Sequence, residues 1–166
     1  ANDGIGSNAP RATEADCYSA CSLTTSDIAN SKTVTPDEAN APYNTASAEY
    51  AACSYTITCN AGYTAKNGTN PQCVANKYTV TLDKNQGTGD VTAYVECTFD
   101  SGAGKLPATD GLARAGYVSA NKWCTNANGS GACYAANIAT SENISANGSD
   151  TKLYAIWESY GIKGGK

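Results

Sequence analysis

The hydrophobic and β-branched residues of the chain gather in its second half, where they alternate with polar residues. Residues 78–82 alternate in this way, residues 83–90 are rich in Asp, Asn and Gly, and residues 91–99 alternate again. Two alternating runs that are joined by turn-forming residues predict a β-hairpin. Residues 153–157 predict a further strand, with the first, third and fifth side chains on one face. Both tryptophans and the only phenylalanine also lie in this half, so we expect the main hydrophobic core there.

The first half of the chain has fewer aliphatic residues and weaker periodicity. Residues 13–21 and 46–53 favour short helices, and a single helical turn is expected after Pro36. Residues 55–59 alternate and predict a strand. The remaining positions are rich in Ser, Thr, Asn and Asp, which favour turns and loops. Together the two halves predict a mainly β fold with short helices, of the α+β class.

The change in composition along the chain predicts four segments. We expect an extended N-terminal arm at 1–12, a disulfide-rich module at 13–76, a second β module at 77–158 and a C-terminal tail at 159–166. The chain starts without a methionine and without an apolar leader, which is typical of a mature form whose signal peptide has been removed.

Cysteine is the most informative residue type, because the chain has eight cysteines and no histidine. The close pairs lack the Cys-x-x-Cys spacing of zinc knuckles, so disulfides are favoured over a metal site. Disulfides indicate an oxidising compartment, outside the cell or at its surface. The candidate disulfide residues are Cys17, Cys21, Cys53, Cys59, Cys73, Cys97, Cys124 and Cys133.

The cysteine distribution favours some pairings but leaves the full connectivity open. The Asn-, Gly- and Ser-rich loop 125–132 favours a local bridge between Cys124 and Cys133. Five cysteines lie in the first half and three in the second, so complete pairing requires a bridge between the halves. Cys97 is then the expected partner for the N-terminal module. The cysteine spacing of the first half has a weak similarity to EGF-like modules.

The second half carries a set of residues in a distinctive order. These are 78–83, Asn85, Gly87, Leu106, Pro107, 114–117, Trp123 and 150–157. In these residues the chain resembles the Listeria–Bacteroides repeat, also called the internalin B-repeat, of bacterial surface proteins. The resemblance implies a β-grasp-like fold, with motif positions at Tyr78, Val80, Leu82, Gly116, Tyr117, Trp123, Leu153, Tyr154 and Trp157. The chain departs from the family in Cys97, Cys124 and Cys133 and in an insertion between Trp123 and Tyr134.

Catalytic and cofactor chemistry finds little support in the sequence. The absence of histidine removes the usual general base. A carboxylate pair for glycoside hydrolysis could be formed among Asp83, Asp90 and Asp100, but turn-capping acids are the favoured interpretation. Residues 83–90 have a superficial similarity to a calcium loop but lack its bidentate Glu, so a turn is favoured there too. We therefore expect no enzyme activity, no metal site and no cofactor.

Charge and hydropathy limit the classes of partner. The net charge is −4 and the basic residues are scattered, so nucleic acid is not an expected partner. No apolar run approaches the roughly 20 residues of a membrane span. Eleven tyrosines favour contact surfaces.

Four sequons are candidate glycosylation sites, although unmodified loops are the favoured interpretation. They begin at Asn67, Asn128, Asn143 and Asn147.

The two terminal segments have compositions that do not fold alone, so we expect another copy of the protein to take one of them up as an added strand. A head-to-tail contact of this kind that does not close builds a filament. The sequence therefore predicts a non-enzymatic extracellular or cell-surface structural protein, a filament or adhesin subunit whose main partner is itself. The alternative is a monomeric module that binds a glycan or a host protein through exposed aromatic residues.

Overall fold

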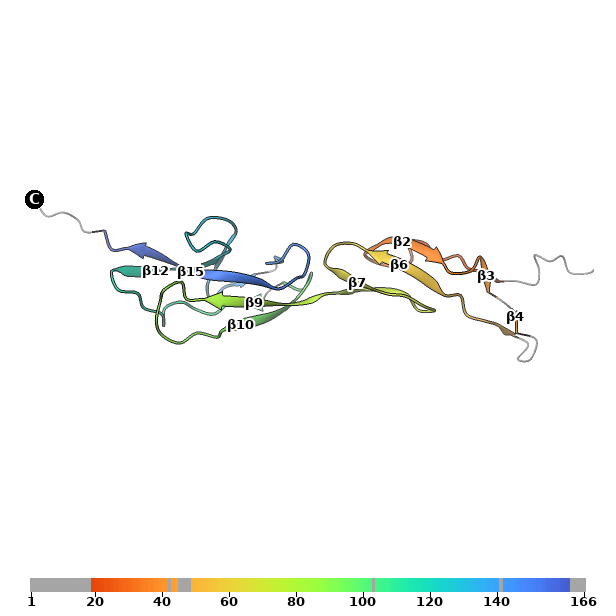
Figure 1. The fold of residues 1–166 in the computed structure, drawn as a ribbon, viewed down its shortest axis with the longest axis horizontal. Coiled ribbons are helices and arrows are strands. Elements are labelled where there is room, and N and C mark those ends of the chain that lie inside the picture. The colour runs from red at the N-terminus through yellow and green to blue at the C-terminus, as the bar shows by residue number, and fades with distance from the viewer. Residues whose placement is uncertain (1–18, 42, 45–48, 103, 141, 162–166) are drawn as a thin grey trace, which may run out of the picture. The chain divides into compact units, whose positions relative to one another are not determined.

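The computed structural model describes residues 19–41, 43–44, 49–102, 104–140 and 142–161. Within these ranges the chain forms fifteen β-strands and no helix (Figure 1). The chain divides into two compact units. The first comprises residues 1–60 and 65–74, and the second comprises residues 61–64 and 75–166. The predicted arm and most of the C-terminal tail lie outside the described residues.

The first unit is built from short antiparallel strand pairs. Its longest pair joins β2 (Ser31–Pro36) to β6 (Tyr55–Cys59). The shorter pairs are β1 (Ser19–Ala20) with β3 (Asn40–Ala41), and β4 (Tyr43–Asn44) with β5 (Glu49–Tyr50). A further pair joins β7 (Tyr63–Lys66) to β8 (Gln72–Ala75).

The core of the first unit is small and depends on sulfur. Its buried side chains are Ile28, Tyr55 and Ile57. Four cysteines in two disulfides pack against them, together with Leu23 and Val34. A core of this size buries too little apolar surface to fold without covalent support.

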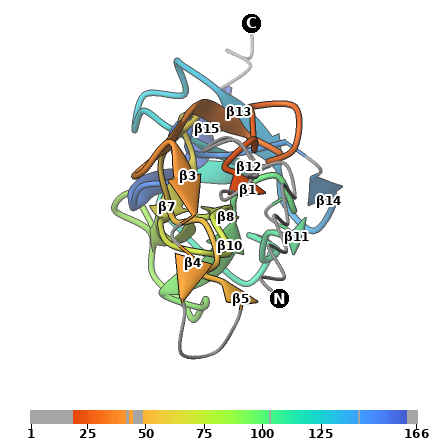
Figure 2. The same ribbon diagram turned by 90° about the vertical axis from the view of Figure 1, so that its right-hand side faces the viewer.

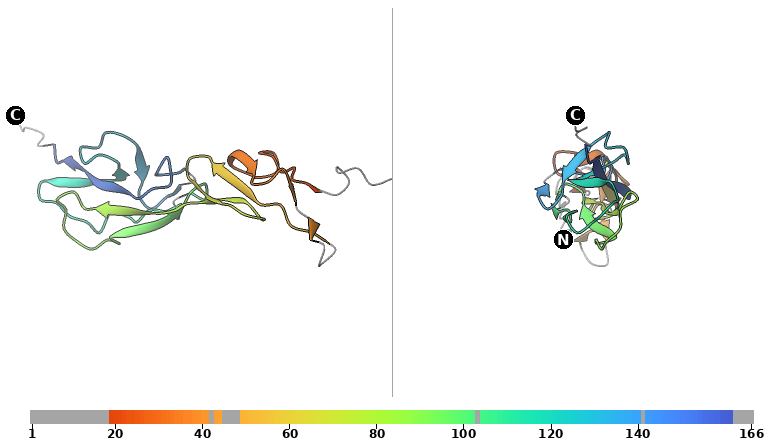
Figure 3. Two further views of the ribbon diagram at one scale, coloured as in Figure 1. Left: turned by 45° about the vertical axis from the view of Figure 1, so that its right-hand side comes forward. Right: turned by 90° about the vertical axis from the view of Figure 1, so that its left-hand side faces the viewer.

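The second unit contains a five-stranded mixed sheet in the order β10-β9-β15-β12-β13. Its strands are β9 (Lys77–Asp83), β10 (Tyr94–Thr98), β12 (Tyr117–Cys124), β13 (Cys133–Ala135) and β15 (Thr151–Ser159). The central strands β9 and β15 are parallel, and the other neighbours are antiparallel. The sheet occupies the green-to-blue part of the chain in Figure 3. The short strands β11 (Gly104–Lys105) and β14 (Ala139–Thr140) pair separately (Figure 2).

The core of the second unit lies on one face of this sheet. Tyr78, Val80 and Leu82 alternate along β9 and are buried, as the two-residue period predicts. Trp123 is fully buried, and its Nε1 donates a hydrogen bond to the Pro107 carbonyl at 2.8 Å. The long connection between β10 and β12 therefore closes the core with backbone and side chains rather than with a strand of the sheet.

The sequence prediction of a mainly β fold is confirmed, but the predicted short helices are wrong. Ser19–Ala20 and Glu49–Tyr50 are strands, and the residues after Pro36 form a bend that leads into β3. Residues 13–18 and 46–48 lie outside the described residues. Helices this short are marginal in water, and pairing with a neighbouring strand satisfies the same backbone groups.

The predicted strands are confirmed. The hairpin is formed by β9 and β10, residues 55–59 form β6, and residues 153–157 lie within β15. In the part of the chain that the structure describes, no helix could cross a bilayer.

Candidate functional site

The second unit contains a groove with a cavity volume of about 520 Å³. It is formed by the loop before β12, the start of β12 and the end of β15. Its lining combines aromatic, charged and apolar side chains, including Asp110, Leu112, Arg114, Tyr117, Trp157 and Tyr160. Concave sites of this size with a few polar groups are the usual form of small-molecule sites.

Strand pairing places the floor of the groove. Ser119 of β12 lies opposite Trp157 of β15, and the register shifts between Ser119 and Trp123. A bulge of this kind redirects side chains at the end of a sheet. Asn121, with a φ of 52°, lies within the bulge. The strand that leads into the core therefore turns polar groups towards the groove before it reaches Trp123.

A small polar network fixes the bulge. Thr109 is fully buried, and its hydroxyl lies 2.7 Å from the Ser119 hydroxyl and 3.2 Å from Asn121 Oδ1. The Asn121 backbone N–H donates to Ser119 Oγ at 3.1 Å. Because buried hydroxyls are costly without partners, this network holds the loop against the strand.

The turn between β9 and β10 contacts the Trp157 indole and holds it in place. Trp157 Nε1 donates to the Lys84 carbonyl at 3.0 Å. Gly87 packs against the same ring, and a Cβ added there would lie 2.4 Å from Trp157 Cζ2. Glycine is therefore the residue that this close approach allows.

Arg114 is held at the rim of the groove by two contacts. Its guanidinium carbon lies 4.1 Å from the centre of the Tyr117 ring, and its Nη2 donates to Gln86 Oε1 at 2.9 Å. A cation above an aromatic face is favourable. These contacts hold the guanidinium and one face of Tyr117 in place.

The carboxylates singled out by the sequence act in turns and loops. Asp83 Oδ1 accepts from the Asn85 backbone N–H at 2.8 Å, and its Oδ2 lies 3.5 Å from Lys152 Nζ. No group of three or more metal-ligating side chains occurs among the described residues. Among the described residues, Asp83, Asp90 and Asp100 therefore do not gather into a cluster of three acidic side chains.

Asp100 lies in a hydrogen-bonded cluster with Tyr63 and Asn143. The Tyr63 hydroxyl donates to Asp100 Oδ2, and Asn143 Nδ2 donates to Oδ1 at 2.8 Å. The Asp100 backbone N–H returns a bond to Asn143 Oδ1 at 2.8 Å. The hydrogen bonds from Tyr63 and then Asn143 hold the pKa of Asp100 below its ordinary value.

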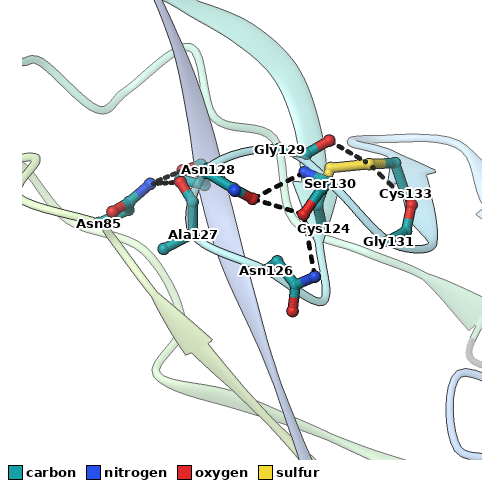
Figure 4. Close-up of a disulfide and its surroundings, with 10 residues drawn as sticks. Asn85, Cys124, Asn126, Ala127, Asn128, Gly129, Ser130, Gly131 and Cys133 are labelled. Atoms are coloured by element: carbon teal, nitrogen blue, oxygen red, sulfur yellow. Dashed lines mark hydrogen bonds between the residues drawn. A yellow bond between two sulfur atoms is a disulfide. The ribbon is translucent and has the colours of Figure 1, made fainter.

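Among the described residues, six of the seven cysteines form three disulfides, Cys21–Cys53, Cys59–Cys73 and Cys124–Cys133. The last of these is the local bridge that the 125–132 loop favoured. In Figure 4 it closes that loop, and Asn128 Oδ1 accepts from the backbone N–H and hydroxyl of Ser130. Asn85 reaches the same loop and donates to the Ala127 carbonyl at 2.7 Å.

Cys97 does not form the bridge to the N-terminal module that the sequence favoured. It is a buried free thiol on β10, and burial raises its pKa. Cys97 lies in the core cluster of the sheet, so its side chain packs as a small apolar group. Cys17 lies outside the described residues.

The four sequon asparagines differ in their side-chain contacts. Asn67 Oδ1 accepts from the Ile57 backbone N–H at 2.9 Å. Asn147 and Asn128 accept from the serine two residues later. The Asn143 side-chain nitrogen, the atom that a glycan would need, already donates to Asp100.

The motif residues of the resembled family divide between core and groove. Tyr78, Val80, Leu82, Trp123 and Leu153 are buried in the core, and Tyr154 is partly buried. Gly116 has a φ of 81° in the turn before β12, a conformation that glycine adopts readily. Tyr117 and Trp157 line the groove instead.

Sequence reasoning missed Asp110, Asn121 and Tyr160 as groove residues. They come from a loop, a bulge and the residue after β15, and only the strand register brings them together. The available signal was Arg114 and Gly116 just before β12 with Tyr117 at its start, which combines a turn with a large exposed aromatic residue.

Comparisons with protein-family models, curated proteins and solved structures found no match to this chain. The disulfides are the remaining evidence on the compartment in which the protein folds. Three intramolecular disulfides indicate an oxidising environment, as for extracellular proteins.

Proposed function

We propose that the protein is a non-enzymatic structural subunit of a bacterial surface filament or adhesin assembly, secreted through a signal peptide and joined to other copies of itself. The observation that carries this proposal is the outer edge of β10. Within the described part of the chain this strand pairs with β9 alone. An open edge offers backbone groups to a strand from another molecule.

The register identifies which backbone groups β10 offers. Hydrogen bonds from the Leu82 N–H to the Ala93 carbonyl and from the Phe99 N–H to the Asn76 carbonyl bracket the strand pair. Hydrogen-bonded and non-hydrogen-bonded pairs alternate between them in an antiparallel ladder. The pairs Thr81↔Tyr94 and Thr79↔Glu96 are thus non-hydrogen-bonded, and the N–H groups of Tyr94 and Glu96 point away from β9.

We also propose that the second unit is a β-grasp-like module related to the internalin B-repeat. Its first and last long strands, β9 and β15, are parallel neighbours at the centre of the sheet, which supports a β-grasp-like arrangement. The residues that carry the resemblance supply both its core and its turns. The connection from β10 to β12 takes the place that a crossing helix would have, and Leu106 and Leu112 from it fill the core.

A proline at position 96 tests assembly through β10. Proline removes the outward N–H and is tolerated on an edge strand, so Glu96→Pro should leave the sheet folded. Glu96→Thr retains the N–H and is the matched control. Sedimentation velocity and negative-stain electron microscopy should show concentration-dependent filaments for the wild type and the Glu96→Thr variant, and monomers for Glu96→Pro. A wild type that stays monomeric at every concentration, or filaments of Glu96→Pro, would contradict the proposal.

A second candidate function is a displayed module that binds a glycan or a host protein. The groove beside Tyr117, Trp157 and Tyr160 is the specific observation in its favour. Tyr160 is 66 % exposed and Tyr117 is 36 % exposed, so both rings are accessible to a ligand. Saturable binding of the protein to host cells that Tyr160→Ala abolishes would support this function, and unchanged binding would contradict it.

A further inference from the structure

We infer that the groove binds a neutral sugar ring of a glycan, an inference that rests on the second candidate function. The floor is apolar, because Leu112 is buried beneath it and the Trp157 ring is half-buried. The rim carries the exposed rings of Tyr117 and Tyr160. A pyranose ring has a C–H face that packs against aromatic carbon and an edge of hydroxyl groups that need polar partners. Tyrosine and tryptophan supply both kinds of contact.

The polar groups of the groove match hydroxyls better than ions. Asp110 and Asn121 both line it and are exposed. A carboxylate accepts hydrogen bonds and an amide nitrogen donates them, whereas each sugar hydroxyl can do both. Asn121 Oδ1 is already bonded to Thr109, so the amide orientation is fixed with its nitrogen available to donate. Two neighbouring hydroxyls could therefore bond to one acceptor and one donor.

The charge of the lining favours a neutral ligand. Among the described residues that line the groove, one acid and one base are charged, Asp110 and Arg114. Arg114 is held by Tyr117 and Gln86, and an anion drawn to its guanidinium would be repelled by the Asp110 carboxylate. A cation would approach Asp110 but be repelled by Arg114. A neutral polyhydroxyl ligand avoids both costs.

The test is titration of the purified full chain with a panel of neutral disaccharides, namely chitobiose, cellobiose, lactose and mannobiose. Because Trp157 lines the groove and Trp123 is fully buried, binding should change the fluorescence of Trp157 selectively. The signal should disappear in Trp157→Phe. Calorimetric titration gives the affinity independently of fluorescence. At least one disaccharide should bind saturably, with millimolar or tighter affinity.

Matched variants localise the site. Asp110→Ala and Tyr160→Ala should each weaken binding about tenfold, which corresponds to about 1.4 kcal/mol. Glu96→Ala and Tyr94→Ala likewise remove one acid and one tyrosine, at exposed positions of β10 outside the groove, and should leave the affinity unchanged. Equal losses in both sets, or no binding by any disaccharide, would overturn the inference. Host-cell binding that Tyr160→Ala abolishes in a protein that binds no sugar would refute the sugar inference but support the second candidate function.

Discussion

The two units should differ sharply in their dependence on disulfides. Two variants test this, one with four cysteines replaced and one with two. In the first, Cys21, Cys53, Cys59 and Cys73 become serine. In the second, Cys124 and Cys133 become serine. We expect the first set to unfold the N-terminal unit and the second set to weaken the C-terminal unit without unfolding it.

The magnitudes follow from the sequence separations that the bridges close. The separations are 32 residues for Cys21–Cys53 and 14 for Cys59–Cys73. In the chain-entropy model these loops contribute about 3.7 and about 3 kcal/mol, or about 7 kcal/mol together. That sum is as large as the total free energy of unfolding of many domains, which is about 5–15 kcal/mol. Because the buried residues of its core cluster are Ile28, Tyr55 and Ile57, the first unit has little else to offset the loss of these disulfides.

The stability of the second unit should depend less on its disulfide. Cys124–Cys133 closes a separation of 9 residues, worth about 2.6 kcal/mol in the same model. Its core contains twelve buried residues, including Trp123, Leu106 and Leu153. Hydrophobic burial on this scale should keep the sheet folded after the bridge is lost.

The assay uses the position of the tryptophans, since both belong to the second unit. Their fluorescence during urea unfolding reports on that unit alone, whereas amide peaks in NMR spectra report on both. The quadruple variant should lose the dispersed peaks of residues 19–60 and keep the native tryptophan transition. If the first unit stays folded in this variant, its core is stronger than its burial indicates and the reasoning is refuted. A tryptophan transition that disappears with the four cysteines would refute the independence of the second unit.

Three further changes test other contacts. Trp123→Phe should lower the free energy of unfolding by about 2–4 kcal/mol, because it leaves a cavity and an unpaired Pro107 carbonyl. Urea unfolding followed by circular dichroism measures this loss, and a loss below about 1 kcal/mol would contradict the reasoning. Gly87→Ala should shift the Trp157 fluorescence and destabilise the protein by about 1–3 kcal/mol, because the added methyl group meets the indole ring. Gly111→Ala is the control and should do neither, because a Cβ there would have its nearest neighbour at 3.9 Å. Asp100 has a lowered pKa when folded, so its hydrogen bonds stabilise the protein above its unfolded pKa of about 3.9 and this contribution disappears as the pH falls through the folded value. Asp100→Asn should therefore flatten the acid side of the melting-temperature profile, with Asp90→Asn as the control, and an unchanged profile would count against the cluster.

Strands with a clear two-residue period could be predicted from the sequence. Tyr78, Val80 and Leu82 alternate with polar residues, and they form the buried face of β9. The Asp- and Gly-rich segment after them forms the turn, with Gln86 at a φ of 68°. Local pattern and tertiary packing agree in this hairpin, so the local pattern was sufficient.

The first unit and the groove could not be predicted in the same way. Strands of two residues, such as Ser19–Ala20, carry no period, so the local pattern does not indicate that this strand pairs with Asn40–Ala41. The groove depends on a register shift near Asn121 and on a long loop that brings Asp110 beside β15. Such positions follow from tertiary packing and are not encoded in hydrophobic spacing.

The 83–90 turn holds two of the side chains that line the groove, Trp157 and Arg114. The Lys84 carbonyl holds the Trp157 indole and Gly87 packs against its ring, while Gln86 holds Arg114 above Tyr117. One short turn thereby positions an aromatic residue on β15 and a charged residue on the loop before β12. Because Trp157 also packs against the core cluster, a change at Gly87 acts on the groove and on the core. Variants in the turn should therefore change ligand affinity and stability together.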